Sequence, residues 1–273
     1  MNPSGHASRR SDLAQRATHG WLLHHHGRRA LLCLPLVFVA AFLVVPLGLT
    51  IIVSFWERAG LKFRPAFSLA SYTTIVDGAR LDVLTRSVIV AIEATAISLL
   101  FAYPIAYFLA RKARPQITRI VLVLFTIPFL INYIVRNVAW TSLLGRNGTV
   151  NTALIESGIT GAPLDWLLYS DFAVFLGLIS TYMPFMIFPL VLSIAAIDRQ
   201  FLEASADLGA SAFSTFRRIT LPLSLPGIFA AIVFGFVGAM GESAVPVIMG
   251  GVGYELLGNT ITSSMDVLNY PLA

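Results

Sequence analysis

The chain has 273 residues, of which 56% are hydrophobic and 12% are charged, and its formal net charge is +5. Its mean hydropathy is +0.78. Soluble domains carry about 25% charged residues and disordered chains are poor in apolar residues, so this composition excludes both classes. We therefore expect an integral membrane protein.

Five apolar segments follow a basic tail, residues 1–29, and approach or exceed the roughly 20 residues that a helix needs to cross a bilayer. The first has an apolar run about twice as long as the core of a secretory signal, so we expect a retained helix. The third is short, and uncharged residues as far as Gly145 could lengthen it. The predicted spans are residues 30–56, 87–110, 120–135, 172–197 and 227–251. The predicted fold is all-α, a polytopic transmembrane helical bundle.

The positions of the arginines and lysines predict the orientation of the chain. Of the 19 basic residues, 12 lie in the tail and in the segments 111–119 and 198–226, which fall on one side of the membrane. Because basic segments stay on the cytoplasmic side, we expect a cytoplasmic N-terminus and a loop at 57–86 on the opposite, outer side of the membrane. Residues 251–273 then lie outside, and 269–273 look like the start of another helix. We therefore expect a sixth span to be missing from the C-terminus.

The residue types that perform most catalytic and metal chemistry are scarce. Cys33 is the single cysteine, and all five histidines precede residue 27. The apolar body therefore offers no cysteine cluster and no histidine for a triad, a haem or a zinc site. Lys62 and Lys112 are the only lysines, and neither belongs to a G-x-x-x-x-G-K-[ST] loop, so this chain cannot hydrolyse ATP by that route. We expect neither enzyme activity nor a metal site.

The segment 198–226, between the fourth and fifth spans, contains signals for two short helices. Asp198 can cap the first, which ends at Gly209, and Ser211 can cap the second, which ends before Pro222. The segment also contains the complete pattern E-A-[AS]-x3-G-x9-I-x-L-P. Its seven defined positions are Glu203, Ala204, Ser205, Gly209, Ile219, Leu221 and Pro222.

This pattern resembles the EAA coupling loop of bacterial ABC importer permeases, with Ser205 in place of the second alanine. Ala204 and Ser205 are small enough for close helix approach. Glu203 offers a charge to a basic residue across an interface, and Gly209 sets the angle between the helices. An amphipathic loop on the lipid surface would explain Phe213 and the nearby arginines, but not the glycine corner together with the terminal Leu-Pro.

Further stretches resemble the spermidine/putrescine branch of these permeases, from about residue 68 onward: 103–111 (YPIAYFLAR), 135–140, 144–148 and 241–251. The resemblance implies a type I permease that works by alternating access. Segment 198–226 would dock on a dimer of ABC ATPase subunits, which bind the ATP and Mg, so this chain needs no cofactor of its own. The other implied partners are a second, related permease subunit, a periplasmic substrate-binding protein and the lipid of the bacterial inner membrane, with no nucleic acid.

The resemblance favours a polyamine as substrate, although related permeases transport iron, phosphonates or opines. A passive channel and a membrane-embedded enzyme are alternatives from other functional classes. An enzyme would be expected to pair acids or histidines at helical spacing, whereas Glu93 and Glu242 lie on different spans. Neither a channel nor an enzyme would copurify with a nucleotide-binding partner.

Three charged residues are candidates for the translocation path: Glu242, Glu93 and Arg136. A carboxylate within a membrane helix costs roughly 2.5–3.5 kcal/mol, so it usually faces protein or water. Glu242 either lines the path and attracts a cation, or makes a structural hydrogen bond to a neighbouring helix. Glu93 could pair with Arg136 if the third span extends past Val135.

Overall fold

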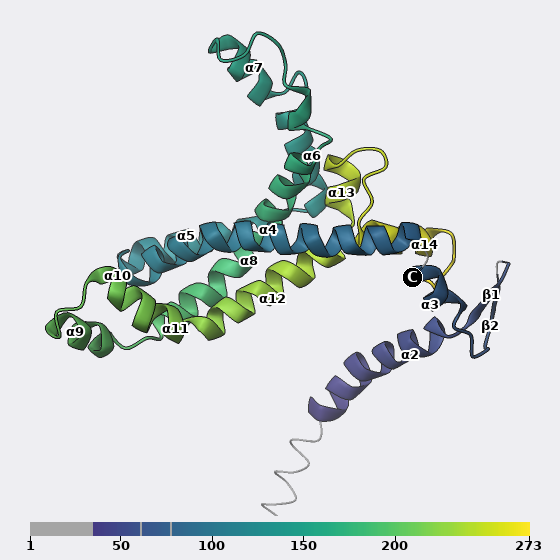
Figure 1. The fold of residues 1–273 in the computed structure, drawn as a ribbon, viewed down its shortest axis with the longest axis horizontal. Coiled ribbons are helices and arrows are strands. Elements are labelled where there is room, and N and C mark those ends of the chain that lie inside the picture. Colours follow the sequence, from purple (N-terminus) through teal and green to yellow (C-terminus); the bar gives the residue numbers. More distant parts are fainter. Residues whose placement is uncertain (1–34, 61, 77) are drawn as a thin grey trace, which may run out of the picture. The chain divides into compact units, whose positions relative to one another are not determined.

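The computed structural model describes residues 35–60, 62–76 and 78–273, and it divides into two compact units after Ser71 (Figure 1). In the first unit, a π-helical turn (Ala40–Val44) leads into α2 (Val45–Ser54). An antiparallel hairpin of β1 (Glu57–Ala59) and β2 (Lys62–Arg64) follows. The predicted tail 1–29 and the start of the first predicted span lie outside the described residues.

Three helices form the core of the second unit. These are α4 (Gly78–Arg111), α8 (Asp171–Ala195) and α12 (Leu225–Gly241), which pack against one another (Figure 1). A short helix, α3 (Ala70–Val76), precedes α4. The predicted second and fourth spans correspond to α4 and α8, although α4 begins earlier than the predicted start at Ser87.

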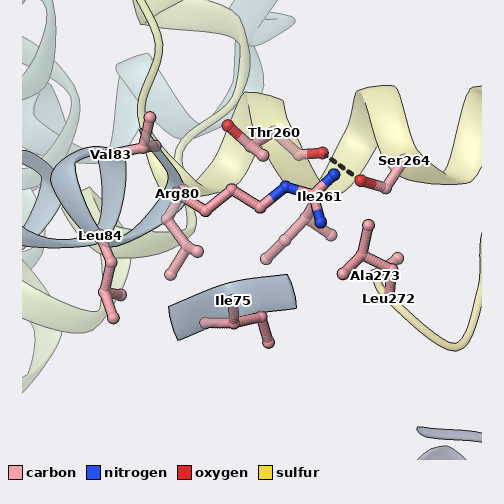
Figure 2. A pocket seen from close by; sticks show the side chains of 10 residues that line it. Ile75, Arg80, Val83, Leu84, Thr260, Ile261, Ser264, Leu272 and Ala273 are labelled. Atoms are coloured by element: carbon pink, nitrogen blue, oxygen red, sulfur yellow. Dashed lines mark hydrogen bonds between the residues drawn. The ribbon is translucent and has the colours of Figure 1, made fainter. Parts of the chain in front are cut away.

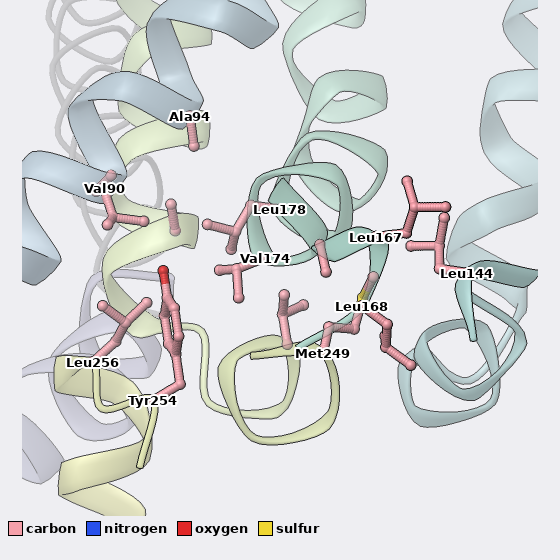
Figure 3. Close-up of a cluster of buried hydrophobic side chains, with 14 residues drawn as sticks. Val90, Ala94, Leu144, Leu167, Leu168, Val174, Leu178, Met249, Tyr254 and Leu256 are labelled. Carbon is pink, nitrogen blue, oxygen red and sulfur yellow. The ribbon is translucent and has the colours of Figure 1, made fainter. Parts of the chain in front are cut away.

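The core contains two clusters of buried apolar side chains. Figure 3 shows the first, in which Val90 of α4, Val174 of α8 and Met249 converge. The second includes Ala106 of α4 and Ile187 of α8, both of which are fully buried. Small residues on the packed faces bring the helix backbones close, which is how helices associate inside a membrane, where lipid is as apolar as the side chains.

The third predicted span is broken rather than continuous. Helix α5 (Pro115–Leu130) ends before Asn132, and α6 (Tyr133–Leu144) leaves at an angle of 97°. The Asn132 side chain accepts a hydrogen bond from the Ile134 amide at 2.9 Å, so it caps the new helix and fixes the break. The prediction of one helix over 120–135 is wrong for this reason. Helix α7 (Thr149–Glu156) continues beyond α6.

The fifth predicted span, 227–251, is also interrupted. Helix α12 ends at Gly241, the backbone of Glu242 is extended, and a short helix α13 (Ala244–Met249) follows.

Helix α14 (Leu257–Asp266) lies in a stretch for which no helix was predicted. By length and composition, the described part of the chain has three helices able to cross a membrane, or up to five if each bent pair is one span. The all-α polytopic class is confirmed.

The segment 198–226 forms a helical corner. Helix α9 (Arg199–Asp207) is followed by α10 (Ala212–Thr215), a π-helical turn (Phe216–Thr220) and α11 (Leu221–Leu223). The last three are continuous, and a bend of 65° at Ser224 separates them from α12. The prediction that the second helix ends before Pro222 is therefore wrong. The wider π turn makes room for the proline ring, which would otherwise clash with the preceding turn.

Candidate functional site

The corner between α9 and α10 is formed by the two capping residues and the glycine that the sequence pattern predicts for it. Asp198 accepts a hydrogen bond from the Gln200 amide at 3.0 Å, and Ser211 accepts one from the Ser214 amide at 3.3 Å. Gly209 has a φ of +74°, a left-handed conformation that glycine adopts without strain. Both predicted caps and the glycine turn are confirmed.

The two small residues of the pattern point in different directions. Ala204 is exposed beside Glu203, whereas Ser205 is only 7% exposed. The Ser205 hydroxyl lies 2.8 Å from the Thr215 hydroxyl, so it joins α9 to α10. The sequence predicts that Ser205 permits close helix approach, and in the structure the helix it approaches is α10, inside the corner.

The outer surface of this corner is apolar. Leu208 and Phe213 are 88% and 71% exposed, and Phe201 is exposed as well. Of the remaining pattern residues, Ile219 and Leu221 are half-buried and Pro222 is exposed. Large exposed apolar side chains on a segment with its own charges are typical of a protein interface.

Glu242 lies at the break between α12 and α13 and accepts three hydrogen bonds. The Tyr182 hydroxyl donates to Oε2 at 2.8 Å. The amides of Ala244 and Val245 donate to Oε1 at 2.9 and 3.3 Å, so the carboxylate caps α13. A Cβ on Gly238 would overlap the Tyr182 ring, and its absence lets the ring lie across α12. The structural hydrogen bond considered for Glu242 is therefore present, and a role in the path stays a prediction.

The other two path candidates, Arg136 and Glu93, have different surroundings. Arg136 donates from Nη1 to the Pro128 carbonyl at 3.2 Å and from Nη2 to the Thr181 hydroxyl at 3.1 Å. It therefore fastens the bend between α5 and α6 to α8. Glu93 is exposed on α4. The expected pairing of Glu93 with Arg136 is not among the ion pairs of the described residues, which are Arg86–Asp171 and Arg146–Asp165.

A polar cluster that sequence reasoning missed joins α4, α8 and the loop after α13. Asp171 accepts hydrogen bonds from Tyr254 at 2.6 Å and from Arg86 at 3.2 Å, and the Arg86 guanidinium lies 4.2 Å from the centre of the Tyr254 ring. Burial, followed by the hydrogen bond to Asp171, raises the pKa of Tyr254 above its ordinary value, so the phenol keeps its proton even where a free tyrosine begins to ionise. The residues are more than 80 positions apart along the chain, and no local motif connects them.

A small cavity of about 130 Å³ lies between α4 and α14 (Figure 2). Its walls are mainly apolar, and the side chain of Arg80 crosses it toward Ser264. No group of histidine, cysteine, aspartate and glutamate side chains that could hold a metal occurs among the residues that the structure describes.

Comparison with known proteins places this geometry in a family. Residues 94–273 match the family described as "Binding-protein-dependent transport system inner membrane component". The chain belongs to this family. It is thus an ABC importer permease of the inner membrane, and the matched residues include segment 198–226, Glu242 and the C-terminal half of α4.

Individual relatives of this permease agree with the family. It is 36% identical over 232 residues to the spermidine/putrescine transport system permease protein PotB of Haemophilus influenzae, covering 84% of this chain and 80% of that one. It is 31% identical to the inner membrane ABC transporter permease protein YdcU of Escherichia coli, covering 78% and 71%. A crystal structure of a bacterial ABC transporter that imports alginate has a TM-score of 0.64 at 17% identity, over 96% of this chain and 90% of that one, which shows the shared fold.

Proposed function

We propose that this permease imports a polyamine such as spermidine or putrescine, driven by ATP hydrolysis in a separate ATPase subunit. The observation that carries the proposal is its 36% identity to spermidine/putrescine permeases across 84% of the chain. The half-buried Glu242, at a helix break within the apolar body, supports a cationic substrate, because an anionic group there attracts a cation more strongly than it would in water.

Segment 198–226 is the proposed docking site for the ATPase. The side chains that it presents outward are those an interface needs: Glu203 for a basic residue, Ala204 for close approach, and the apolar Leu208 and Phe213. Gly209 permits the left-handed turn, and the Ser205–Thr215 hydrogen bond stiffens the corner by joining α9 to α10. Ile219, Leu221 and Pro222 complete the unit where it joins the membrane helices. A stiff corner can transmit the closing of an ATPase dimer to those helices.

The proposed mechanism is alternating access. Closing of the ATP-bound ATPase dimer would pull segment 198–226 and open the membrane helices toward the outside, where a periplasmic binding protein delivers its solute. Hydrolysis would restore the inward-facing state. A related second permease would complete the path, since the three to five spans in the described part of the chain supply only part of a wall. In this arrangement the N-terminus lies in the cytoplasm.

Uptake of radiolabelled spermidine and putrescine tests this function. Cells without their own polyamine uptake would express this chain together with its ATPase, second permease and binding protein. We expect uptake that is lost when the ATPase carries a substitution that permits ATP binding but blocks hydrolysis. Absence of polyamine uptake overturns the substrate, and uptake that persists with the inactive ATPase overturns the mechanism in favour of a passive channel.

A further inference from the structure

One face of the last turns of α4 contacts segment 198–226 at Phe216 and Ser224, and it also contacts Ile197, the residue before the segment. Tyr103, Tyr107 and Arg111 follow one another at four-residue intervals, so they lie on the same side of the helix. They belong to the stretch YPIAYFLAR, which resembles polyamine permeases. That resemblance assigns no role to these three side chains. Their contacts in the structure give them one.

Arg111 holds the N-terminal end of the segment. Its Nη2 donates a hydrogen bond of 2.8 Å to the carbonyl of Ile197, the residue that directly precedes the Asp198 cap of α9. This carbonyl lies two residues beyond the C-terminal end of α8, a position near which the helix dipole favours a cation. A charged donor also makes a stronger hydrogen bond than a neutral one. The contact thus joins the end of α4 to the point where the chain leaves α8.

Tyr103 holds the C-terminal end of the segment. Its hydroxyl lies 2.9 Å from the hydroxyl of Ser224, which is completely buried at the 65° bend before α12. Ser193 of α8 contacts the same bend, donating to the Ser224 carbonyl at 3.4 Å and accepting from the Gly227 amide at 3.3 Å. A side chain on Gly227 would overlap Ser193, so glycine is needed for this approach.

Phe216 connects the two ends. It is the first residue of the π turn, and its ring meets the rings of Tyr103 and Tyr107 edge-on, with centroids 5.9 and 6.0 Å apart. Edge-on aromatic pairs are favourable beyond the area they bury. The helical stretch that follows Ser211 is therefore attached to α4 by packing as well as by polar contacts.

We propose that Tyr103, Tyr107 and Arg111 form a clamp that converts movement of segment 198–226 into movement of α4. This inference rests on the proposed function, in which an ATPase moves that segment. Without the clamp, the segment could rotate about Ile197, just after the end of α8, and about Ser224, at the bend before α12. Its movement would then not be transmitted to the helical bundle. With both points bonded to one helix, α4 must follow. These three are positioning residues, because none needs to contact the substrate.

The test uses the complete transporter in proteoliposomes, with ATP hydrolysis and spermidine uptake measured on the same sample. The variants are Tyr103→Phe, which removes one hydroxyl and keeps the ring, Ser224→Ala, and both together. Arg111→Gln tests the other end. Matched controls are Tyr133→Phe, on an exposed residue of α6, and Arg114→Gln, on an exposed residue three positions from Arg111.

We expect each clamp variant to lower the solute imported per ATP hydrolysed by about three- to tenfold, the effect of one lost hydrogen bond, at an unchanged yield of assembled complex. The double variant should be no worse than the more impaired single variant, because both remove the same contact. The controls should match the wild type. A merely structural role would lower the yield of complex and leave the ratio unchanged.

Two results overturn the clamp while the wild type is active: a wild-type ratio in Tyr103→Phe and Ser224→Ala, or multiplicative effects in the double variant. The conservative Tyr103–Ser224 pair decides the matter if Arg111→Gln fails to assemble.

Failure of the proposed function is distinct, because the wild-type complex itself would then show no ATP-dependent uptake. If the wild type hydrolyses ATP without importing spermidine, the polyamine assignment fails. In that case the clamp is tested by the degree to which the binding protein stimulates ATP hydrolysis. The clamp variants should alter this stimulation, and unaltered stimulation rejects the clamp.

Discussion

Tyr182 of α8 donates its phenolic hydrogen to Glu242, 60 residues later, over 2.8 Å. The contact exists because Gly238 leaves room for the ring and because α12 ends one residue before the carboxylate. The other carboxylate oxygen accepts the first amides of α13. The fold thus stabilises a charged group at a helix break by surrounding it with donors, which is what a carboxylate in an apolar region requires.

Replacing Glu242 by glutamine separates its charge from its hydrogen bonds. The amide oxygen of glutamine can still accept from the Ala244 and Val245 amides, so we expect the transporter to assemble normally. Removal of the charge should lower polyamine uptake by about tenfold, as expected for losing an interaction with a charged group. Tyr182→Phe should have a smaller effect. Unchanged uptake in Glu242→Gln would remove this residue from the translocation path.

Gly238 and Gly241 lie on the same helix and make a matched pair. A Cβ at Gly238 would overlap the Tyr182 ring, whereas nothing lies within 4 Å of the Cβ position at Gly241. Overpacking typically costs about 1–3 kcal/mol, so Gly238→Ala should lower the thermal stability of the purified permease. Gly241→Ala should leave it unchanged or slightly higher, since alanine favours helix. Equal melting temperatures for both variants would contradict the role of Gly238.

Arg136 and Glu93 should behave differently, because only the arginine is bonded to its surroundings. Arg136→Gln removes the contacts that fasten the α5–α6 bend to Thr181 and should destabilise the permease by about 1.5–3 kcal/mol. Glu93 is exposed, so Glu93→Gln should have no effect on stability. Melting curves of the two purified variants, compared with the wild type, provide the measurement. A similar loss in both would revive the idea that the two charges are paired.

Ala204 and Ser205 are neighbours with opposite exposures, which makes their variants informative. Ala204→Trp places a bulky side chain on the exposed surface and should abolish copurification with the ATPase, without a change in melting temperature. Ser205→Ala removes the hydrogen bond to Thr215, at a cost of about 1 kcal/mol, and should retain the ATPase. If the ATPase still copurifies with Ala204→Trp, this surface is not the docking site.

Local patterns predicted the parts of the fold that depend on neighbouring residues. Apolar runs predicted the core helices α4 and α8, and capping residues with a left-handed glycine predicted the corner at Gly209. Such features are set within a few positions of the chain. The breaks at Asn132 and Glu242 were missed because an apolar stretch looks the same whether it is straight or bent. The Asn132 cap is local, but the contacts that hold the two bent segments in place come from Thr181 and Tyr182 of α8.

The candidate site was predictable to a similar extent. The pattern from Glu203 to Pro222 marked the right segment, but not which of its residues face inward, since that depends on the fold of the corner itself. Ser205 illustrates this, because its partner Thr215 lies across the turn. The Asp171–Tyr254 contact spans 83 residues and has no sequence signature at all.

The bonds at opposite ends of α4 determine which deformations are easiest for this permease. Arg86 and Asp171 connect α4 to α8 at one end, and Arg111 with the Ile197 carbonyl connects the same helices at the other. Two helices that are bonded to each other at both ends resist sliding along their axes and tilt as a single body. We then expect bending at Asn132 and Glu242, where the helices are already interrupted. Rocking of a rigid helix pair about these pivots would require few hydrogen bonds to break in each transport cycle.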